Sequence, residues 1–398
     1  MENFNFHVKP IGLLDMLHFK KMVPRRRAIL QAGSLEPITA VYAVNRLAQS
    51  MHPKQQKAVV SAVIPRKDAY TYILKADHLA YFRAGQYVSV KLQIRDSVTS
   101  RPYTLAASPS LALEGEYQIT VKKAQDAFVS DYIHNNWQVG TEVTLSGPEG
   151  PFSYEPIRDE AEVVGIAGGS GITPFRSLEK AIYEGDEKCS LVLLYGSRTL
   201  KDAVFSDEIA AWAAENDKIK LVNVLSDETA EGCESGFITA ELIKKYAPEG
   251  DYSIFLCGPQ AMYNFADKEI EKLGIRRKFV RHELFGEYFH PEKNADYKGD
   301  IDATYTITVR MNGEEYKVPC KADTTLLRAM EAAGLNPPSD CRSGRCGWCH
   351  SQLLSGDVYV PESVDGRRMA DKIYGYIHPC CSFPLGDVAI DVPVMPKD

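Results

Sequence analysis

The sequence predicts several domains: a short helical extension, an antiparallel β-barrel, an α/β domain with a parallel sheet, and a compact α+β domain. Two changes of pattern indicate this order. Short strand-like segments fill about 100 residues after Lys57, and from Ala161 onward buried-type strands alternate with helical stretches. A length of 398 residues is also too great for one hydrophobic core. We expect domains at 1–55, 56–157, 158–288 and 303–398, with a linker over 289–302.

The composition is that of an ordinary globular protein. Hydrophobic residues make up 44% of the chain and charged residues 25%. The net charge of −7 argues against a nucleic-acid binder, which is usually basic. No apolar stretch is long enough to span a bilayer, and the N-terminus has no secretory apolar region. The chain has nine cysteines, and we expect a cytoplasmic protein in which the four near the C-terminus bind metal rather than form disulfides.

The first 55 residues predict a short helical extension. Apolar residues recur there at helical spacings, and prolines and a glycine divide them into short segments. The apolar positions are Leu13, Leu14, Leu17, Ile38, Val41, Val44 and Leu47.

The next region predicts a small antiparallel barrel. Its strand-like segments are short and rich in branched and aromatic residues, and glycine, proline and aspartate separate them. They cover residues 58–64, 70–74, 87–92, 117–121 and 142–145.

The third region predicts βαβ units. A buried-type strand at Val163–Ala167 is followed by a glycine-rich turn and then by a helical stretch from Phe175 to Tyr183. Further strands at 191–195, 220–225 and 252–256 alternate with helical patterns, which is typical of a parallel sheet. The polar stretch from Gly286 to Asp302 predicts a linker to the last domain.

Cysteines near the C-terminus carry the most specific spacing. Cys341, Cys346 and Cys349 form a C-x4-C-x2-C pattern, with Cys380 further on. This spacing is typical of plant-type [2Fe–2S] ferredoxins, in which four thiolates hold two irons. The alternative is a structural zinc site, but zinc sites favour paired C-x2-C motifs and only one such pair is present here.

Spacing alone leaves the fourth ligand open between Cys380 and Cys381. One side chain of an adjacent pair can point toward a cluster while the other points away. The segment from Pro379 to Pro384 resembles the A-C-Q-S-x-P ending of ferredoxin domains, which have a β-grasp-like α+β fold. The resemblance implies that Cys380 is the ligand.

A second motif combines an anion-binding residue with an aromatic ring. It is the pentapeptide Arg101-Pro-Tyr-Thr-Leu105, which follows the segment 87–92. An arginine can hold a phosphate through two hydrogen bonds, and Tyr103 lies on the same face of an extended segment, where its ring could stack on a flavin. The alternative is an ordinary surface strand with cross-strand pairs.

The pentapeptide resembles the R-x-Y-[ST]-L motif of the ferredoxin–NADP reductase superfamily, and Gly85–Tyr87 and Ser146–Phe152 also look like that family. The resemblance implies a flavin domain in which Arg101 binds the flavin phosphate, Tyr103 stacks, and Thr104 lies near the reactive N5.

Further flavin contacts are implied in the same way. Val121 and Lys122 would flank the flavin, and Ser130, at the start of a helical segment, would donate to a pyrophosphate. The form R-P-Y-T-L favours FAD over FMN. The sequence departs from the family at 124–127, where glycines are common.

A glycine-rich turn follows the first strand of the α/β region. Gly168-Gly-Ser-Gly-Ile-Thr-Pro174 offers close backbone approach and a helix start, both of which suit a pyrophosphate. It resembles the G-G-[ST]-G-x-[TS]-P motif of the same superfamily, and 257–262 resembles its C-G-P-x-x-M motif. The nucleotide contacts that this implies are Gly168, Gly169, Gly171, Thr173, Cys257, Gly258 and Pro259.

Other residues complete the nicotinamide site by resemblance. Cys257 would lie beside the nicotinamide C4, and Glu283 and Phe285, in a closing E-x-F pattern, near the flavin. Ser197 and Arg198 end a strand where a ribose 2′-phosphate could bind, or they form a solvated turn, so NADH and NADPH both remain open. We expect Thr104, Thr173, Cys257 and Glu283 to act at the hydride-transfer site, the first three by positioning rather than by acid–base catalysis.

The order of motifs looks like that of the reductase components of multicomponent oxygenases, such as the phthalate dioxygenase, phenylacetyl-CoA and ketosteroid hydroxylase reductases. The resemblance implies an NAD(P)H oxidoreductase that passes electrons through FAD to a [2Fe–2S] cluster and on to an acceptor protein. The expected exit lies beside Arg342, Arg345, Trp348 and His350, where the arginines either guide an acidic partner or are simply solvated. The alternatives are a self-sufficient reductase of a small molecule or quinone, and a redox sensor.

Overall fold

The computed structural model describes residues 42–95, 97–123, 128–284 and 286–393, together with positions 17, 18, 22, 24, 25 and 28. The chain divides into two compact units, residues 1–48 and 49–398. The six isolated positions are helical, and helix α2 spans Ala43–Met51. Much of the predicted helical pattern, including Leu13, Leu14, Ile38 and Val41, lies outside the described residues.

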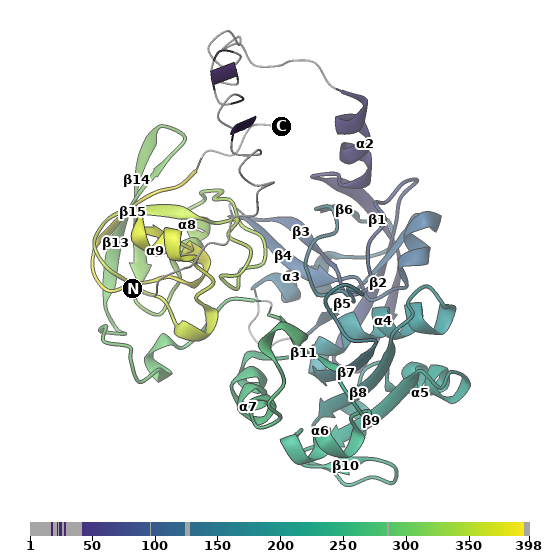
Figure 1. Ribbon diagram of the computed structural model, residues 1–398. Coiled ribbons are helices and arrows are strands. Elements are labelled where there is room, and N and C mark those ends of the chain that lie inside the picture. Colours follow the sequence, from purple (N-terminus) through teal and green to yellow (C-terminus); the bar gives the residue numbers. More distant parts are fainter. Residues whose placement is uncertain are drawn as a thin grey trace. The chain divides into compact units, whose positions relative to one another are not determined.

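The first domain of the larger unit is an antiparallel half-barrel, as predicted (Figure 1). Six strands pair in the order β4-β3-β6-β1-β2-β5, and β6 pairs with both β1 and β3. Buried residues such as Val60, Leu74, Val90 and Ile119 fill its core. The elements are β1 (Gln56–Pro65), β2 (Ala69–Lys75), β3 (Tyr87–Ile94), β4 (Ser97–Thr104), β5 (Glu116–Lys122), β6 (Glu142–Leu145) and helix α3 (Phe128–Asn136).

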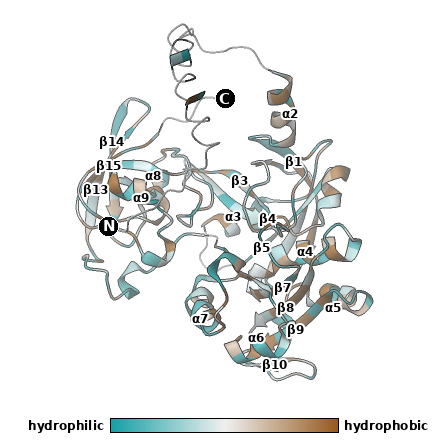
Figure 2. Ribbon diagram, viewed as in Figure 1, coloured by the Kyte–Doolittle hydropathy of each residue, from teal (hydrophilic) through white to brown (hydrophobic). Residues whose placement is uncertain are grey.

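The second domain is a parallel sheet in the order β10-β9-β8-β7-β11-β12. Its central strands β7, β8 and β11 carry apolar residues on both faces, and brown hydrophobic segments follow β7, β8 and β9 in Figure 2. The strands are β7 (Glu162–Gly168), β8 (Ser190–Ser197), β9 (Ile219–Leu225), β10 (Glu234–Ser235), β11 (Ser253–Cys257) and β12 (Val280–Glu283). The helices are α4 (Thr173–Glu184), α5 (Ser206–Glu215), α6 (Ala240–Tyr246) and α7 (Gln260–Glu271).

The register of this sheet brings the predicted site together. Gly168, Cys257 and Glu283 are the last residues of β7, β11 and β12. Because these strands are parallel neighbours, their carboxyl ends meet at one edge, and Cys257 pairs directly with Glu283. Ligands of open α/β sheets bind at this edge.

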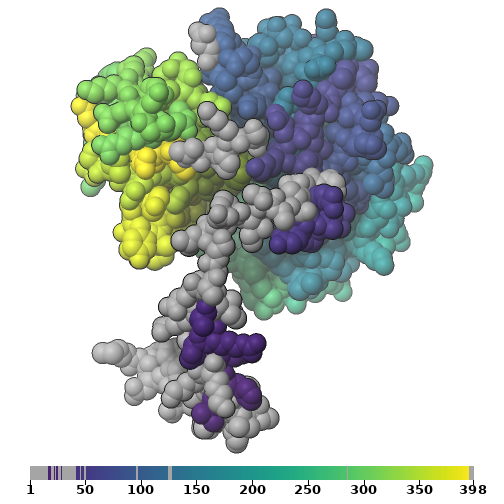
Figure 3. Space-filling model, turned by 90° about the horizontal axis from the view of Figure 1, so that it is seen from above, coloured from purple at the N-terminus to yellow at the C-terminus, as the bar shows by residue number. Residues whose placement is uncertain are grey.

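The C-terminal domain is the predicted α+β unit. A five-stranded sheet runs in the order β14-β13-β19-β15-β17, and β16 pairs with β18. In Figure 3 its green-to-yellow surface lies beside the blue surface of the half-barrel. The elements are β13 (Thr304–Met311), β14 (Glu314–Lys321), α8 (Leu326–Ala332), β15 (Ser351–Ser355), β16 (Val358–Tyr359), α9 (Met369–Ile373), β17 (Tyr376–Ile377), β18 (Phe383–Pro384) and β19 (Val388–Asp391).

Short 3₁₀ turns connect these elements at Pro109–Glu114, Gly169–Ile172, Leu200–Asp202, Arg277–Phe279, Pro291–Lys293, Glu362–Val364 and Pro379–Cys381. None of the helices among the described residues has the length and apolar character needed to cross a bilayer. The predicted linker is not a free tether, because Tyr297 packs edge-on against Tyr359, and the Tyr359 hydroxyl donates to Asp296 Oδ1 at 2.7 Å.

Helix α4 carries an acid that the fold buries completely. Glu179 is 0% exposed, and neither of its carboxyl oxygens has a hydrogen-bond partner among the described residues. Burial raises the pKa of Glu179 well above its usual 4.5, so the folded protein must keep the group protonated. The unfolded chain loses that proton as the pH rises above about 4.5, so this residue lowers the stability of the fold increasingly at higher pH.

We therefore expect Glu179→Met to stabilise the protein more at pH 8 than at pH 5. The expected gain is about 1–3 kcal/mol, since an apolar side chain removes the cost of burying an unpaired polar group. Thermal unfolding at both pH values checks this, with Glu271→Met, at an exposed position of α7, as the matched control. Equal gains at pH 5 and pH 8 would contradict the assignment.

Candidate active site

Three predicted residues from two domains meet at one point. Thr104 ends β4, and its hydroxyl donates to Glu283 Oε2 at 3.3 Å. The Cys257 Sγ lies 4.0 Å from the same oxygen. All three side chains are buried, with exposed fractions of 4–5%. The half-barrel and the parallel sheet thus build this site jointly.

Burial favours the neutral form of both the thiol and the carboxyl of this site. Burial raises the pKa of Glu283 well above its usual value, and burial is also the largest cause that raises the pKa of Cys257. Ionisation of Glu283 would raise the pKa of Cys257 further. Glu283 Oε1 has no partner in the described part of the chain. An uncharged carboxyl with an unused oxygen can hydrogen-bond a bound ligand, whereas a protonated, buried thiol is a poor nucleophile.

The glycine-rich turn lies against the end of β11. A Cβ at Gly171 would stand 2.2 Å from the Cys257 carbonyl oxygen, and one at Gly168 would stand 3.0 Å from Pro259 Cδ. The two predicted nucleotide motifs therefore touch through their backbones, a contact that only glycine permits. The Thr173 hydroxyl donates to the Ser170 carbonyl at 3.1 Å. Thr173 is also the first residue of α4, whose free N–H groups suit a pyrophosphate.

The turn also approaches the half-barrel. Gly169 adopts a positive φ of 53°, and a Cβ there would lie 3.8 Å from Lys122 Nζ. Lys122 forms an ion pair with Asp68 at 3.0 Å. Gly258 follows Cys257 directly and sits against Met262, whose sulfur would be 2.6 Å from an added Cβ.

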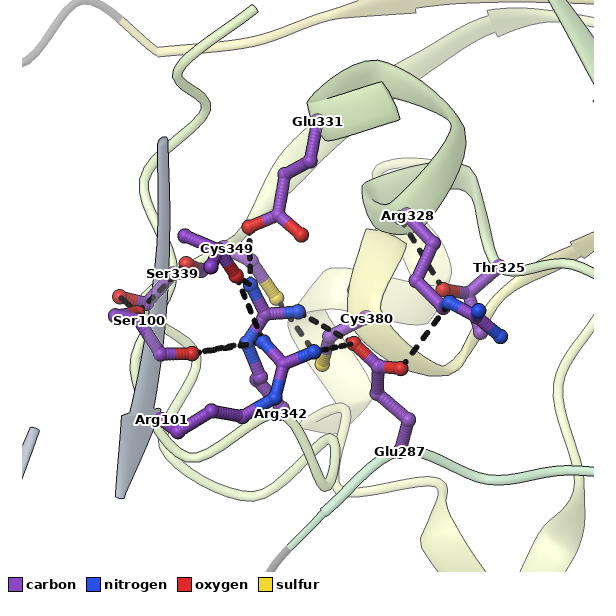
Figure 4. A network of polar contacts seen from close by, with 11 residues as sticks. Ser100, Arg101, Glu287, Thr325, Arg328, Glu331, Ser339, Arg342, Cys349 and Cys380 are labelled. Atoms are coloured by element: carbon purple, nitrogen blue, oxygen red, sulfur yellow. Dashed lines mark hydrogen bonds and ion pairs between the residues drawn. The ribbon is translucent and has the colours of Figure 1, made fainter. Parts of the chain in front are cut away.

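The predicted flavin motif lies on the edge strand β4. Arg101 Nη1 donates to Thr99 Oγ1 at 2.8 Å and to the Ser100 carbonyl at 2.9 Å, and Nη2 lies 3.4 Å from Glu287 Oε1 (Figure 4). Burial, and then the neighbouring charge of Arg342, lower the pKa of Arg101. Tyr103 is half-buried and packs against the core of the barrel. Arg101 thus places a cation, partly shielded from water, beside an aromatic ring, and this arrangement fits a flavin phosphate.

Two other predicted flavin contacts differ in what they offer. Val121 is 1% exposed and packs in the barrel core, so only its backbone remains for a ligand. Ser130 lies in the first turn of α3, and its buried hydroxyl has no partner among the residues described. An unpaired buried hydroxyl at a helix start fits the predicted pyrophosphate contact. The departure at 124–127 lies outside the described residues.

The end of β8 fits a nucleotide ribose. Ser197 Oγ is buried without a partner in the described chain, while the Arg198 side chain is 72% exposed and lies 3.9 Å from Asp202 Oδ2. Both side chains are therefore available to a ligand. Phe285, also predicted at this site, lies outside the described residues.

The four predicted metal ligands form two pairs of sulfur atoms. Cys349 Sγ lies 3.4 Å from Cys380 Sγ, and the Cys346 N–H donates to Cys341 Sγ at 3.3 Å. The Cys381 thiol instead donates to the His378 carbonyl, which favours Cys380 as the fourth ligand. The C-x4-C-x2-C spacing, with only one C-x2-C pair, is what favours a two-iron cluster over a single zinc.

Hydrogen-bond donors of the cysteine loop point at two of its sulfur atoms. Hydrogen bonds, first from the Cys346 thiol and then from Ser343, lower the pKa of Cys341 to about 5 despite its burial. The Trp348 N–H donates to Cys346 Sγ at 3.4 Å. Hydrogen bonds between neighbouring thiols, together with burial, raise the pKa of Cys346, Cys349 and Cys380, so only Cys341 favours the thiolate form without a bound metal. The loop fits the cluster through its backbone N–H donors, which can stabilise the charge of bound sulfur.

The prediction that Arg342 flanks an exposed exit is wrong. Arg342 is 1% exposed, and its guanidinium forms ion pairs with Glu287 and Glu331. Burial lowers its pKa, but the two carboxylates outweigh burial and the net shift is upward. Arg345, three residues on, is exposed as expected.

Sequence reasoning missed the residues that join the domains. Glu287, within the predicted linker, is 9% exposed, and its carboxylate contacts Arg101, Arg328 and Arg342 (Figure 4). No local signal marks it, because a glutamate in a polar stretch is usually solvated.

Three known families match the chain in the order of its domains. The family described as oxidoreductase FAD-binding domain matches residues 59–154. The oxidoreductase NAD-binding domain family matches 166–268, and the 2Fe-2S iron-sulfur cluster binding domain family matches 309–385. The predicted cofactors, FAD, a nicotinamide dinucleotide and a [2Fe–2S] cluster, are confirmed by these matches.

Similar proteins extend over most of the chain. The ferredoxin reductase component of 3-ketosteroid-9-alpha-monooxygenase from Rhodococcus rhodochrous is 30% identical over 319 residues, 78% of this chain and 87% of that protein. The glycine betaine monooxygenase reductase subunit from Chromohalobacter salexigens is 27% identical over 341 residues, 81% of this chain and 91% of that protein. The structure of phthalate dioxygenase reductase has the same fold, with a TM-score of 0.63 and 21% identity, over 85% of this chain and 98% of that one.

Proposed function

This chain belongs to the ferredoxin–NADP reductase superfamily, in the group whose chains end in a [2Fe–2S] ferredoxin domain, and we propose that it is the reductase component of a multicomponent oxygenase. It is an NAD(P)H oxidoreductase that passes electrons through FAD to the cluster and on to an acceptor. What we propose is that the acceptor is an oxygenase. The proposal is supported by the relatives of this chain, which are named as reductase parts of monooxygenases. We place this reaction in the cytoplasm, where thiols stay reduced.

The single observation that carries the proposal is the convergence of two domains on Glu283. Thr104, from the strand with the flavin motif, and Cys257, from the nucleotide motif, both lie beside its carboxyl. A flavin and a nicotinamide held by these motifs would therefore meet at one position that is shielded from solvent. Proximity and orientation of this kind lower a barrier without any acid or base.

When bound, FAD and the cluster supply the change from two-electron hydride transfer to one-electron transfer. The protein's own residues supply position and exclusion of water. Gly171 lets the nucleotide loop contact the end of β11, and Cys257 and Glu283, both buried and neutral, present hydrogen-bonding groups without a charge that would repel a ligand. Thr104 fixes the orientation of the Glu283 carboxyl.

The cysteine loop has a buried end and an exposed end. Cys341 is 4% exposed and adjoins contacts to β3 and β4, whereas Cys346 is exposed beside Arg345 and Trp348, the latter 54% exposed. We propose that electrons enter on the side of Cys341 and leave on the side of Cys346. An aromatic and cationic surface of this kind suits an acidic partner surface.

The test uses purified protein under anaerobic conditions. The released flavin is identified by mass, iron and acid-labile sulfide are measured, and NADH and NADPH are added separately while flavin bleaching and the reduced-cluster signal are followed. We expect both signals to change and substrate turnover to require an added oxygenase component. Turnover of substrate by the reductase alone would favour a self-sufficient enzyme, and negligible NAD(P)H oxidation would favour a sensor. Protein that carries zinc but no iron would refute the proposal.

A further inference from the structure

The loop that carries Cys341 is bonded to the half-barrel on the N-terminal side of this cysteine. The Tyr87 hydroxyl donates to Asp340 Oδ2 at 2.8 Å, and the Ser89 hydroxyl donates to the other oxygen of the same carboxylate. Ser100 Oγ lies 3.3 Å from the Ser339 carbonyl oxygen. Asp340 is 6% exposed, so these bonds are shielded from water. They hold the loop against strands β3 and β4.

Arg342 makes the contacts on the other side of Cys341. Its Nε donates to the Ser100 carbonyl at 2.7 Å, and Nη2 donates to Thr99 Oγ1 at 2.8 Å. Nη1 bonds Glu287, and Nη2 also bonds Glu331 of α8 (Figure 4). One side chain thus joins β4, the segment after β12, helix α8 and the cysteine loop.

Burial of this arginine is the unusual feature. A charged guanidinium is rarely fully buried, and here its side chain is 0% exposed. Its planar fork of donors can reach acceptors in several directions at once, which a lysine cannot do. Its Glu287 partner also contacts Arg101, the predicted ligand of the flavin phosphate. The flavin motif and the cysteine loop therefore share a carboxylate.

We propose that Arg342 is a positioning residue that holds the cysteine loop against β4 and so fixes the separation between the flavin and the cluster. The inference rests on the proposed function. In each internal transfer one electron leaves the reduced flavin and one oxidised cluster gains it, with no bond made or broken, and a second transfer returns the flavin to its oxidised form. Because electron transfer slows steeply with distance, a loop that moves away from β4 would slow this step alone.

The direct test is Arg342→Met, which keeps an apolar stem and removes every donor. We expect reduction of the flavin by NADH, and ferricyanide reduction by the flavin, to remain at the wild-type rate. The flavin-to-cluster step, followed by stopped-flow absorbance and freeze-quench electron paramagnetic resonance, should slow by about tenfold or more, as expected when reacting groups are misplaced by an ångström or so. A wild-type rate for this step in iron-loaded protein would overturn the proposal.

Arg367→Met is the matched control. Arg367 is also partly buried and bonds a carboxylate through two nitrogens, but its partner Asp365 belongs to the same domain. We expect this variant to leave the flavin-to-cluster step unchanged. An equal slowing in both variants would show a general loss of domain integrity and overturn a specific role for Arg342.

A second readout does not depend on turnover. Hydrogen–deuterium exchange should increase at 97–101 and 339–345 in Arg342→Met but not in Arg367→Met, since only the first variant releases the contact between the domains. If Arg342→Met loses iron, Thr99→Val tests the same contact from the half-barrel side, away from the cysteines. Because Thr99 Oγ1 also accepts from Arg101, the comparison uses protein with wild-type flavin content and a wild-type rate of flavin reduction by NADH. Slower internal transfer in iron-loaded Thr99→Val supports the proposal, and unchanged transfer overturns it. None of these measurements needs an oxygenase. If NAD(P)H failed to reduce the cluster of the wild-type protein, the proposed function would be refuted instead.

Discussion

Replacing Glu283 with alanine is expected to slow hydride transfer from NAD(P)H by about two orders of magnitude. The carboxyl is the common partner of Thr104 and Cys257, so its removal leaves both side chains without the group that orients them. Stopped-flow bleaching of the flavin measures this step directly. Flavin content must be unchanged for the comparison, because Glu283 lies between the predicted flavin and nucleotide sites.

The Glu283→Gln variant separates position from charge. Glutamine keeps the shape and the hydrogen bonds but cannot ionise. Since burial raises the pKa of Glu283, the wild-type carboxyl is protonated at neutral pH and becomes a carboxylate only as the pH rises through that elevated value. We expect the wild-type rate of hydride transfer to fall at alkaline pH and the Glu283→Gln rate to stay level. Parallel pH profiles would show that Glu283 is not the titrating group.

Replacing Cys346 with serine should abolish electron delivery to cytochrome c and leave ferricyanide reduction largely intact. Cytochrome c needs an electron from the cluster, whereas ferricyanide accepts one from the flavin. Cys346 belongs to one of the two sulfur pairs, and a lost thiolate disrupts that pair. Iron content, the cluster signal and the two activities are the measurements.

Cys381→Ser is the matched control for this experiment. The Cys381 thiol is buried next to a predicted ligand but bonds the His378 carbonyl. We expect the variant to keep its iron and reduce cytochrome c normally. Loss of both activities in a folded, flavin-loaded Cys346→Ser protein would count against a relay from flavin to cluster.

Local patterns predict most of the secondary structure because they reflect local physics. The segments 70–74, 87–92 and 117–121 form the cores of β2, β3 and β5, where branched and aromatic side chains pack on the inner face of the sheet. The helix predicted at Phe175–Tyr183 is α4, and the glycine-rich turn precedes it as expected. The cysteine spacing likewise predicts a compact loop with three sulfurs, and Cys380 adds the fourth from a later turn.

Contacts between domains are what sequence patterns do not contain. Arg342 and Arg345 share one loop and similar neighbours, yet one is buried and the other exposed. The difference comes from Glu287 and Glu331, which lie 55 and 11 residues away along the chain. Since each glutamate alone looks solvated, no periodicity marks the pair before the domains come together.

The fused architecture changes how the internal step responds to dilution. The cluster-bearing domain follows the nucleotide domain in the same chain, which tethers it to the flavin-bearing domain, and Asp340 and Arg342 hold it against that domain. Such a tether gives an effective concentration on the order of millimolar, which dilution of the sample does not lower. Only the encounter with a separate acceptor should then slow as the protein is diluted, so in a scarce reductase the encounter, and not the internal transfer, would limit the supply of electrons.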